Sequence, residues 1–283
     1  RGRAKARPKL RATKIDQIFE EWHKATKPPV YANNTWQVYG RFYRDYIKPV
    51  FGERGISDIS SLHIQKYINL MAEKYSPETV NKCFNILVDI FNFAKDVLKY
   101  RPDNPTDGIK RCKITTKSKT VWTDEQFSYF LSLPEVQNSH YYPMLCLSAA
   151  LGARPGEVCG LREDCLSTDP CYLYQLCTED IDNYAYETDL KNKKSHRTPP
   201  IPQYLYDLLH QRQSWKRELH LQHPEWGDND YLFVSQNGNP IKPRQYSVGF
   251  KRLLTAHNRR MQSYKEKHQK LPHGEQELPY ITL

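Results

Sequence analysis

Apolar residues recur at helical spacing through the first hundred residues. Positions three and four apart are hydrophobic in four successive segments, a period typical of amphipathic helices. The first predicted helix runs from near Thr13 to a break at 27–29. The second carries Trp36, Tyr39, Tyr43 and Tyr46 and is ended by Pro49. The third begins after Ser60 and Ser61, and the fourth begins at Ser76 and Pro77.

The pattern of the second half is mixed. Thr123 followed by Gln126 is a capping box, which opens a helix, and a more apolar helix is expected over 141–151. From 171 to 201 the period shortens to two, which is typical of strands. The remaining predicted elements are three short strands at 171–178, 184–190 and 196–201, a long helix from Pro202 past Trp215, a strand at 231–234, a turn at 237–238, a helix around 246–254 and a polar segment at 263–278.

These elements predict a mainly α (α+β) protein in two domains. A basic flexible arm at 1–12 precedes a helical domain at 13–105. A basic linker at 106–121 leads to a mostly helical domain at 122–283, which holds a small three-stranded antiparallel sheet. A chain of 283 residues is long enough for two cores.

The net charge of +10 is unevenly distributed. Residues 1–113 hold 22 Lys and Arg against 12 Asp and Glu, whereas 114–283 hold 20 of each. A concentrated basic excess suits a surface that follows phosphates, because neutralising phosphates releases counterions. A solvated tail, a membrane surface and acidic partners are the other interpretations of charge alone.

Cysteine usage and hydropathy exclude some classes. Seven cysteines are scattered without a C-x-x-C pair, although four recur every six residues from Cys159 to Cys177. That spacing is not typical of zinc ligands, so we expect reduced, buried thiols and no metal. No signal peptide or membrane-spanning run is apparent, so we expect a cytoplasmic protein without membrane partners.

Three parts of the chain, in order, resemble the tyrosine recombinase (phage integrase) family. The first comprises 13–105, including the runs 49–52, 76–81 and 104–105. The second is AALGARPGEVCGLREDCL (149–166), similar to the first catalytic box, with Arg154 at the catalytic arginine and Glu157 at the acid that braces it. The third is DLKNKKSHRTPPIP (189–202), similar to the hairpin that carries the catalytic lysine, here Lys191, with Lys193 and Lys194 as neighbours that could be confused with it.

The resemblance also identifies an expected absence. In the family, the second box, His-x-x-Arg, follows a short segment that residues 279–283 resemble, and the nucleophilic tyrosine comes after it. Neither His268 nor His273 has an arginine three positions later, and Tyr280 precedes the expected box. We therefore expect this chain to be cut just before the second box, and to bind DNA without cleaving it.

The resemblance implies site-specific integration or excision of a mobile element, from a phage or conjugative transposon, by strand cleavage and rejoining through a phosphotyrosine. An arginine suits such phosphoryl transfer because its planar fork binds phosphate and stays charged, and a crowded lysine can donate a proton to the leaving oxygen. No cofactor is implied. The implied fold is a SAM-like helical domain and a catalytic domain that form a C-shaped clamp on DNA.

The implied partners are double-stranded DNA carrying recombination sites, further copies of the chain in a dimer or tetramer, and an accessory excision factor, in association with a bacterial nucleoid. The residues expected to contact DNA are cations and one amide: Arg41, Arg44, Asn81, Lys82, Lys110, Arg111, Lys113, Lys117, Lys119, Lys193 and Arg244.

Other interpretations stay open at this point. Arg154 could cap the C-terminus of the preceding helix, Glu157 could be a surface acid, and Lys191 could lie at a solvated hairpin tip. The aromatic positions of the second helix fit a core better than a base-stacking platform. At the level of function, the alternatives are a non-catalytic DNA-binding regulator, a relaxing enzyme like the type IB topoisomerases, and a helical protein-interaction module.

Overall fold

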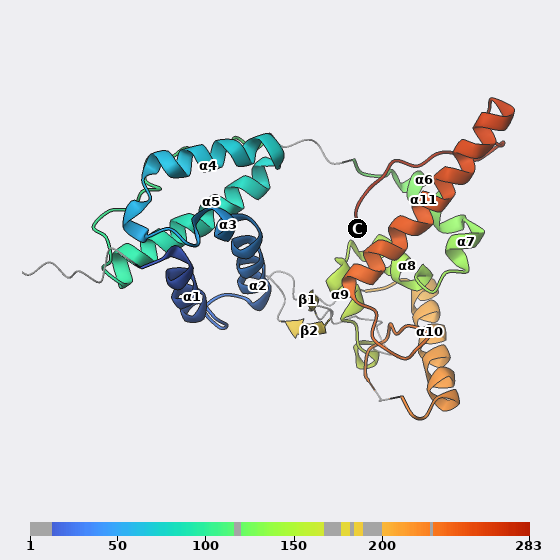
Figure 1. Cartoon of the computed structure of the whole chain (residues 1–283). Coiled ribbons are helices and arrows are strands. Elements are labelled where there is room, and N and C mark those ends of the chain that lie inside the picture. The colour runs from blue at the N-terminus through green and yellow to red at the C-terminus, as the bar shows by residue number, and fades with distance from the viewer. Residues whose placement is uncertain (1–12, 116–119, 167–176, 182–183, 189–199, 227–228) are drawn as a thin grey trace, which may run out of the picture. The chain divides into compact units, whose positions relative to one another are not determined.

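The computed structural model describes residues 13–115, 120–166, 177–181, 184–188, 200–226 and 229–283 (Figure 1). The chain divides into two compact units, Arg1–Lys117 and Ser118–Leu283. Each unit has a hydrophobic core of its own. The division falls within the segment predicted as a linker.

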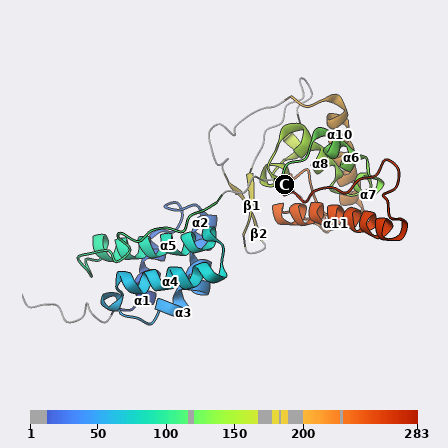
Figure 2. The ribbon, with the colours of Figure 1, turned by 90° about the horizontal axis from the view of Figure 1, so that it is seen from above.

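The first unit is built from the predicted helices. Its α-helices are α1 (Ile15–Ala25), α2 (Asn33–Phe42), α3 (Lys48–Phe51), α4 (Ser61–Lys74) and α5 (Pro77–Asn92), with a short 3₁₀ turn at Ile56–Asp58 and a π turn at Phe93–Val97. The predicted start of α5 is confirmed, because the Ser76 hydroxyl accepts a hydrogen bond from the Thr79 amide. Helices α4 and α5 lie side by side in both ribbon views (Figures 1 and 2).

The end of the second predicted helix is different. Pro49 does not end it, because a π turn at Tyr43–Ile47 connects α2 directly to α3. Pro49 lies in the first turn of α3. A proline is tolerated there since its missing N–H would have no partner within the helix.

The first part of the predicted linker belongs to the first unit. Asn104, Pro105 and Thr106 are buried, and the Asn104 carboxamide accepts hydrogen bonds from both the amide and the hydroxyl of Thr106. Ile109 and Cys112 pack against the core. Residues 104–112 are therefore part of the helical unit rather than a free connection.

The second unit is also mostly helical. Its helices are α6 (Asp124–Ser132), α7 (Pro134–Gln137), α8 (Tyr142–Leu151), α9 (Pro155–Cys159), α10 (Gln203–Gln222) and α11 (Pro243–His268), with a 3₁₀ turn at Glu163–Cys165. The capping box predicted at the start of α6 is confirmed, with reciprocal hydrogen bonds between Thr123 and Gln126. Helix α11 is far longer than the predicted 246–254, because buried Phe250, Leu254, His257 and Met261 continue its inner face.

Two strands are present among the described residues. Strand β1 (Cys177–Ile181) pairs antiparallel with β2 (Tyr184–Thr188), with Cys177 opposite Thr188. The predicted third strand lies largely at 196–199, outside the described residues, so the three-stranded sheet stays a prediction. The strand predicted at 231–234 is wrong: Tyr231 and Val234 form only isolated bridges, to Arg162 and Pro240.

The last residues of the chain pack on the core of the second unit. The Trp122 indole N–H donates to the Pro279 carbonyl (2.7 Å), and the Asn258 carboxamide makes two hydrogen bonds with the backbone of Leu278. Leu278 is buried, and Ile281 and Leu283 contact the same core. These contacts join the start of the unit, α11 and residues 278–283 around one core.

Candidate functional site

A turn between two helices presents Arg154. Helix α8 ends at Leu151, and Gly152 has the left-handed conformation (φ +58°) that terminates helices and favours glycine. Arg154 is then the N-cap residue of α9, with Pro155 in the first turn. The backbone of Arg154 thus begins α9 rather than ending α8.

The guanidinium of Arg154 is held by one buried carboxylate. Its Nη1 donates to Oε1 of Glu157 at 3.0 Å, and the Arg154 backbone N–H donates to Oε2, also at 3.0 Å. The Glu157 side chain is 5% exposed, whereas that of Arg154 is 63% exposed. Glu157 is thus no ordinary surface acid: it binds one edge of the guanidinium of a side chain that is otherwise largely exposed.

The surroundings of α9 restrict how far this pair can move. Val158 and Cys159, next to Glu157, are buried in the core. Helices α8 and α11 are joined by a 2.8 Å hydrogen bond between the hydroxyls of Ser148 and Tyr246. Burial raises the pKa of Tyr246, so its hydroxyl stays protonated. The turn that carries Arg154 therefore lies between packed helices.

Several predicted site residues lie outside the described residues. These are Lys117, Lys119, Lys191, Lys193 and Lys194. Arg244 is described, and is exposed in the first turn of α11. Their roles stay predictions.

Two predicted cations of the first unit lie around one aromatic ring. The Arg41 guanidinium carbon is 5.9 Å and the Lys82 ammonium is 5.0 Å from the centroid of the Phe42 ring. The Phe42 ring contacts the Tyr46 ring (5.3 Å between centroids), and the Tyr46 ring contacts the Tyr75 ring (5.1 Å). We call Arg41, Phe42, Tyr46, Tyr75 and Lys82 the Phe42 patch. None of these five residues is fully buried, and both cations are exposed.

The other predicted contacts of the first unit have different surroundings. Arg44 is exposed on the π turn and pairs with its neighbour Asp45. The Asn81 carboxamide donates to the Cys112 carbonyl (2.8 Å) and accepts from the Cys112 amide (2.9 Å), so both of its polar atoms already have partners. Lys110, Arg111 and Lys113 are exposed in the segment that Asn81 holds.

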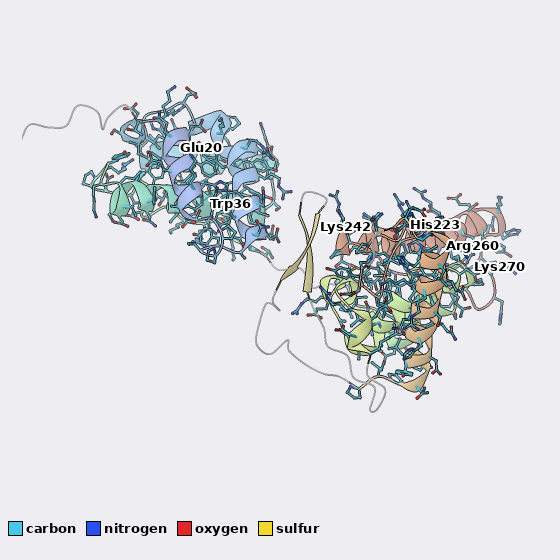
Figure 3. The ribbon with its side chains drawn as sticks, turned by 90° about the horizontal axis from the view of Figure 1, so that it is seen from below. Glu20, Trp36, His223, Lys242, Arg260 and Lys270 are labelled. Atoms are coloured by element: carbon cyan, nitrogen blue, oxygen red, sulfur yellow. The ribbon has the colours of Figure 1, made fainter. Side chains whose placement is uncertain are left out.

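The aromatic positions of the second predicted helix separate in the structure. Tyr43 is buried and stacks on Phe19 with ring centroids 3.6 Å apart. Trp36, labelled in Figure 3, stacks on His23, and its indole N–H donates to the His23 carbonyl. Tyr46 belongs to the Phe42 patch. The π turn adds one residue to the turn, which rotates the later side chains away from the earlier ones.

This arrangement can bind a phosphate at a defined place. An arginine with one edge fixed and the rest exposed offers preorganised donors to an oxyanion. Among the residues that the structure describes, no group of three or more His, Cys, Asp or Glu could hold a metal ion, and no helix is long and apolar enough to cross a membrane.

Sequence reasoning did not identify Arg212. It is buried on α10 without an acidic partner among the residues described. A single cation in an amphipathic helix gives no local signal of burial.

Comparisons with known proteins find similar sequences. Residues 14–72 match a family model described as "Phage integrase, N-terminal SAM-like domain". The chain is 29% identical over 262 residues to a tyrosine recombinase XerC-like protein of Caldanaerobacter subterraneus subsp. tengcongensis, covering 84% of this chain and 64% of that protein. It is 27% identical over 202 residues to the ICEBs1 integrase of Bacillus subtilis, covering 69% and 52%. The chain thus spans about half to two thirds of the length of these relatives.

Solved structures share the fold. The Tn1549 transposon integrase in complex with transposon right end DNA superposes with a TM-score of 0.68 at 19% identity, over 92% of this chain and 81% of that one. A lambda integrase tetramer bound to a Holliday junction gives a TM-score of 0.65 at 14% identity, over 89% and 68%.

Proposed function

We propose that this chain, which belongs to the tyrosine recombinase (integrase) family, contributes DNA binding and part of the catalytic machinery to site-specific recombination. The observation that carries the proposal is the pair formed by exposed Arg154 and buried Glu157. Their segment, 149–166, resembles the family's first catalytic box. Arg154 would hold the scissile phosphate and stabilise charge on its non-bridging oxygens. Lys191 would donate the proton to the leaving oxygen.

The reaction of the whole protein would be cleavage and rejoining of DNA strands through a phosphotyrosine. The one His-x-x-Arg in the sequence, His257 to Arg260, lies before residues 279–283, which resemble the segment that precedes the family's second box, and His257 is buried. We therefore propose that the 283 residues bind DNA without cleaving it. Double-stranded recombination sites are the proposed substrate, because the relatives solved with DNA include a transposon-end complex and a Holliday-junction complex.

Self-association on DNA is proposed on similar grounds, since the lambda integrase structure is a tetramer. Integration or excision of a mobile element, with an accessory excision factor and in association with a bacterial nucleoid, would be the setting. The first unit would supply contacts to the DNA backbone through the Phe42 patch and Arg44, with Lys110, Arg111 and Lys113 as further cations. Arg244 would add a contact from the second unit.

The test compares the 283-residue chain with the complete gene product on the same DNA. Both proteins are incubated with the junction sequences that flank the gene, in duplexes nicked so that a covalent protein–DNA complex is trapped. We expect both to bind duplex DNA with an affinity that falls as salt rises, and only the complete product to form the complex. A covalent complex with the 283-residue chain would refute the proposed division of labour.

Two outcomes would favour other functions. If the complete gene product bound the junctions but formed no covalent complex, a non-catalytic regulator would be supported. If it relaxed supercoiled plasmid lacking the junctions as fast as plasmid carrying them, a topoisomerase-like activity would be supported.

A further inference from the structure

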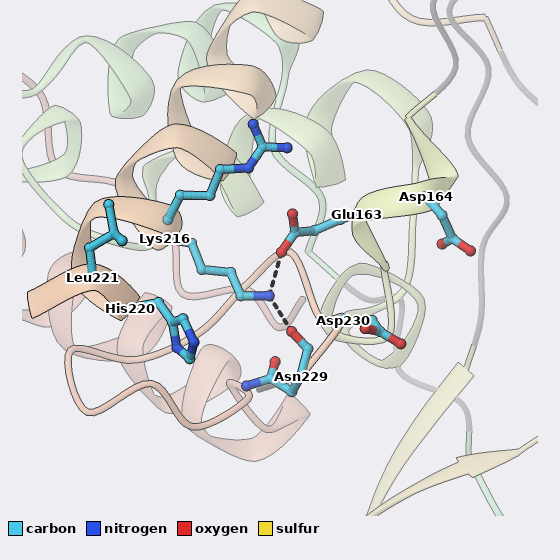
Figure 4. A pocket seen from close by; sticks show the side chains of 8 residues that line it. Glu163, Asp164, Lys216, His220, Leu221, Asn229 and Asp230 are labelled. Carbon is cyan, nitrogen blue, oxygen red and sulfur yellow. Dashed lines mark hydrogen bonds and ion pairs between the residues drawn. The ribbon is translucent and has the colours of Figure 1, made fainter. Parts of the chain in front are cut away.

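Helix α10 carries two buried cations one turn apart, and the described part of the chain supplies a carboxylate to only one of them. Lys216 donates to the Glu163 carboxylate and to the Asn229 carbonyl (Figure 4). Lys216 is 8% exposed and Arg212 is 7% exposed. Among the described residues, no carboxylate pairs with Arg212. The contrast makes Arg212 the position that needs an explanation, because an unpaired buried charge is costly.

The guanidinium of Arg212 is held in place, but not all of its N–H donors have hydrogen-bond partners among the described residues. Its Nη2 donates to the Val234 carbonyl, and its central carbon lies 3.8 Å from the centroid of the Trp215 ring. Its Nε is buried and has no hydrogen-bond partner in the part of the chain that the structure describes. Burial lowers the pKa of Arg212 to about 10, which still leaves the group charged at neutral pH. A fixed cation therefore keeps an unused donor.

A cavity of about 440 Å³ opens beside this cation. It lies between the α7–α8 corner, α10 and the loop after Val234, and Arg154 is not among its lining residues. None of the lining residues is acidic. The size suits a small ligand.

The remaining lining divides into donors and apolar surface. Gln137, Asn138 and Gln236 bring carboxamides, and Ser139 brings a hydroxyl whose oxygen already accepts from the Tyr141 amide, so its O–H can donate. Trp215 and Leu208 add flat and aliphatic surface. Neutral donors around one cation are the surroundings that a carboxylate or phosphate group prefers.

We propose that the cavity beside Arg212 is an anion-binding site, which takes a small ligand bearing a carboxylate or phosphate group with its apolar part against Trp215. The oxyanion would accept from the guanidinium and from the carboxamides. This site is separate from the proposed recombination chemistry and does not depend on it.

The experiment titrates the 283-residue chain with inorganic phosphate and, separately, with benzoate, at ionic strength held constant by sodium chloride. Binding is followed by the indole N–H resonance of Trp215, which the Trp215→Phe variant identifies. We expect a saturable shift with at least one probe. The probe that binds more tightly tells whether the site prefers a phosphate or a carboxylate.

Three variants decide whether Arg212 is responsible. Arg212→Met should weaken binding by about tenfold or more, because a hydrogen-bonded charge pair is lost. Gln236→Glu keeps the side-chain shape, adds a negative charge in the cavity and should weaken binding similarly. Gln222→Glu, exposed at the far end of α10 and outside the cavity lining, should bind as the parent does.

The outcome does not depend on whether Arg212→Met folds. Thermal melting checks each variant, and Gln236→Glu leaves Arg212 and its packing in place. A shift that does not saturate with either probe would overturn the proposal. Equal dissociation constants for the parent and Gln236→Glu would overturn it as well.

Discussion

The Phe42 patch of the first unit and the Arg154 turn of the second unit present their cations in opposite ways. In the Phe42 patch of the first unit, Arg41 and Lys82 are exposed and lie against an aromatic ring, and neither pairs with a carboxylate of the described residues. In the second unit, Arg154 has one edge bound to a carboxylate that is itself buried. Long exposed side chains can follow a phosphate backbone without fixing any single phosphate. An anchored arginine can hold one phosphate in a defined position, which is what chemistry at that phosphate requires.

The largest effect is expected when the anchored cation is changed and its charge kept. Arg154→Lys in the complete gene product should reduce the single-turnover cleavage rate by at least about 10³-fold, because lysine lacks the planar fork that stabilises the transition state. DNA affinity should change by less than about twofold, since many other cations contribute. Cleavage is measured on trapped junction DNA and affinity by gel shift. A loss of DNA affinity as large as the loss of cleavage rate would show that Arg154 contributes to DNA binding and not to the chemical step.

A smaller effect is expected when the anchor is removed and the cation kept. Glu157→Gln preserves shape but loses the charged hydrogen bonds to Arg154, which are worth about 1.5–3 kcal/mol. Cleavage should fall by about 10- to 100-fold if that energy is used to position Arg154. Glu218→Gln, an exposed acid on α10, is the matched control and should cleave normally.

Folding and positioning are separated by a second measurement on the same variant. The melting temperature of Glu157→Gln reports its stability, and the rate is compared at a temperature where the variant is fully folded. A normal rate under those conditions would mean that Glu157 stabilises α9 without positioning Arg154.

The unanchored cations should act on affinity and salt dependence instead. Arg41→Gln and Lys82→Gln should each lower DNA affinity several-fold and reduce the slope of log affinity against log salt by about 1. Cleavage of saturated complexes should be unchanged. Lys24→Gln, an exposed cation outside the patch, is the control. A change in the cleavage rate at saturating DNA would mean that the Phe42 patch also acts on the chemical step, as Arg154 is expected to do.

Local signals in the sequence predicted much of the fold. Ser76 and Thr123 begin helices through their own hydroxyls, so a few neighbouring residues specify each start. The prediction that Pro49 ends the helix was wrong because a π turn places Pro49 in the first turn of a further helix. No neighbouring residue in the sequence indicates that π turn. The length of α11 was missed because its last turns are polar except for buried positions such as Met261.

The candidate site was predictable to a smaller extent. The resemblance selected Arg154 and Glu157, but the burial of Glu157 depends on how α9 packs, which is a tertiary property. Arg212 and Lys216 look alike in the sequence, one turn apart on one helix. Only the fold gives Lys216 a carboxylate from residue 163 and leaves Arg212 without one among the described residues.

The smallest effect on DNA is expected at Asn81, which the sequence grouped with the contacts. Its carboxamide makes two hydrogen bonds with the backbone of Cys112 and so holds the segment that carries Lys110, Arg111 and Lys113. Asn81→Ala should lower the free energy of unfolding by about 1–2 kcal/mol, measured by urea denaturation, because both backbone groups lose a partner. DNA affinity, measured where the variant is fully folded, should change by less than about twofold. A larger loss, with the salt slope unchanged, would mean that the position of this segment matters for binding more than the charge of any one residue, and the first unit would then also hold its cations by an anchor.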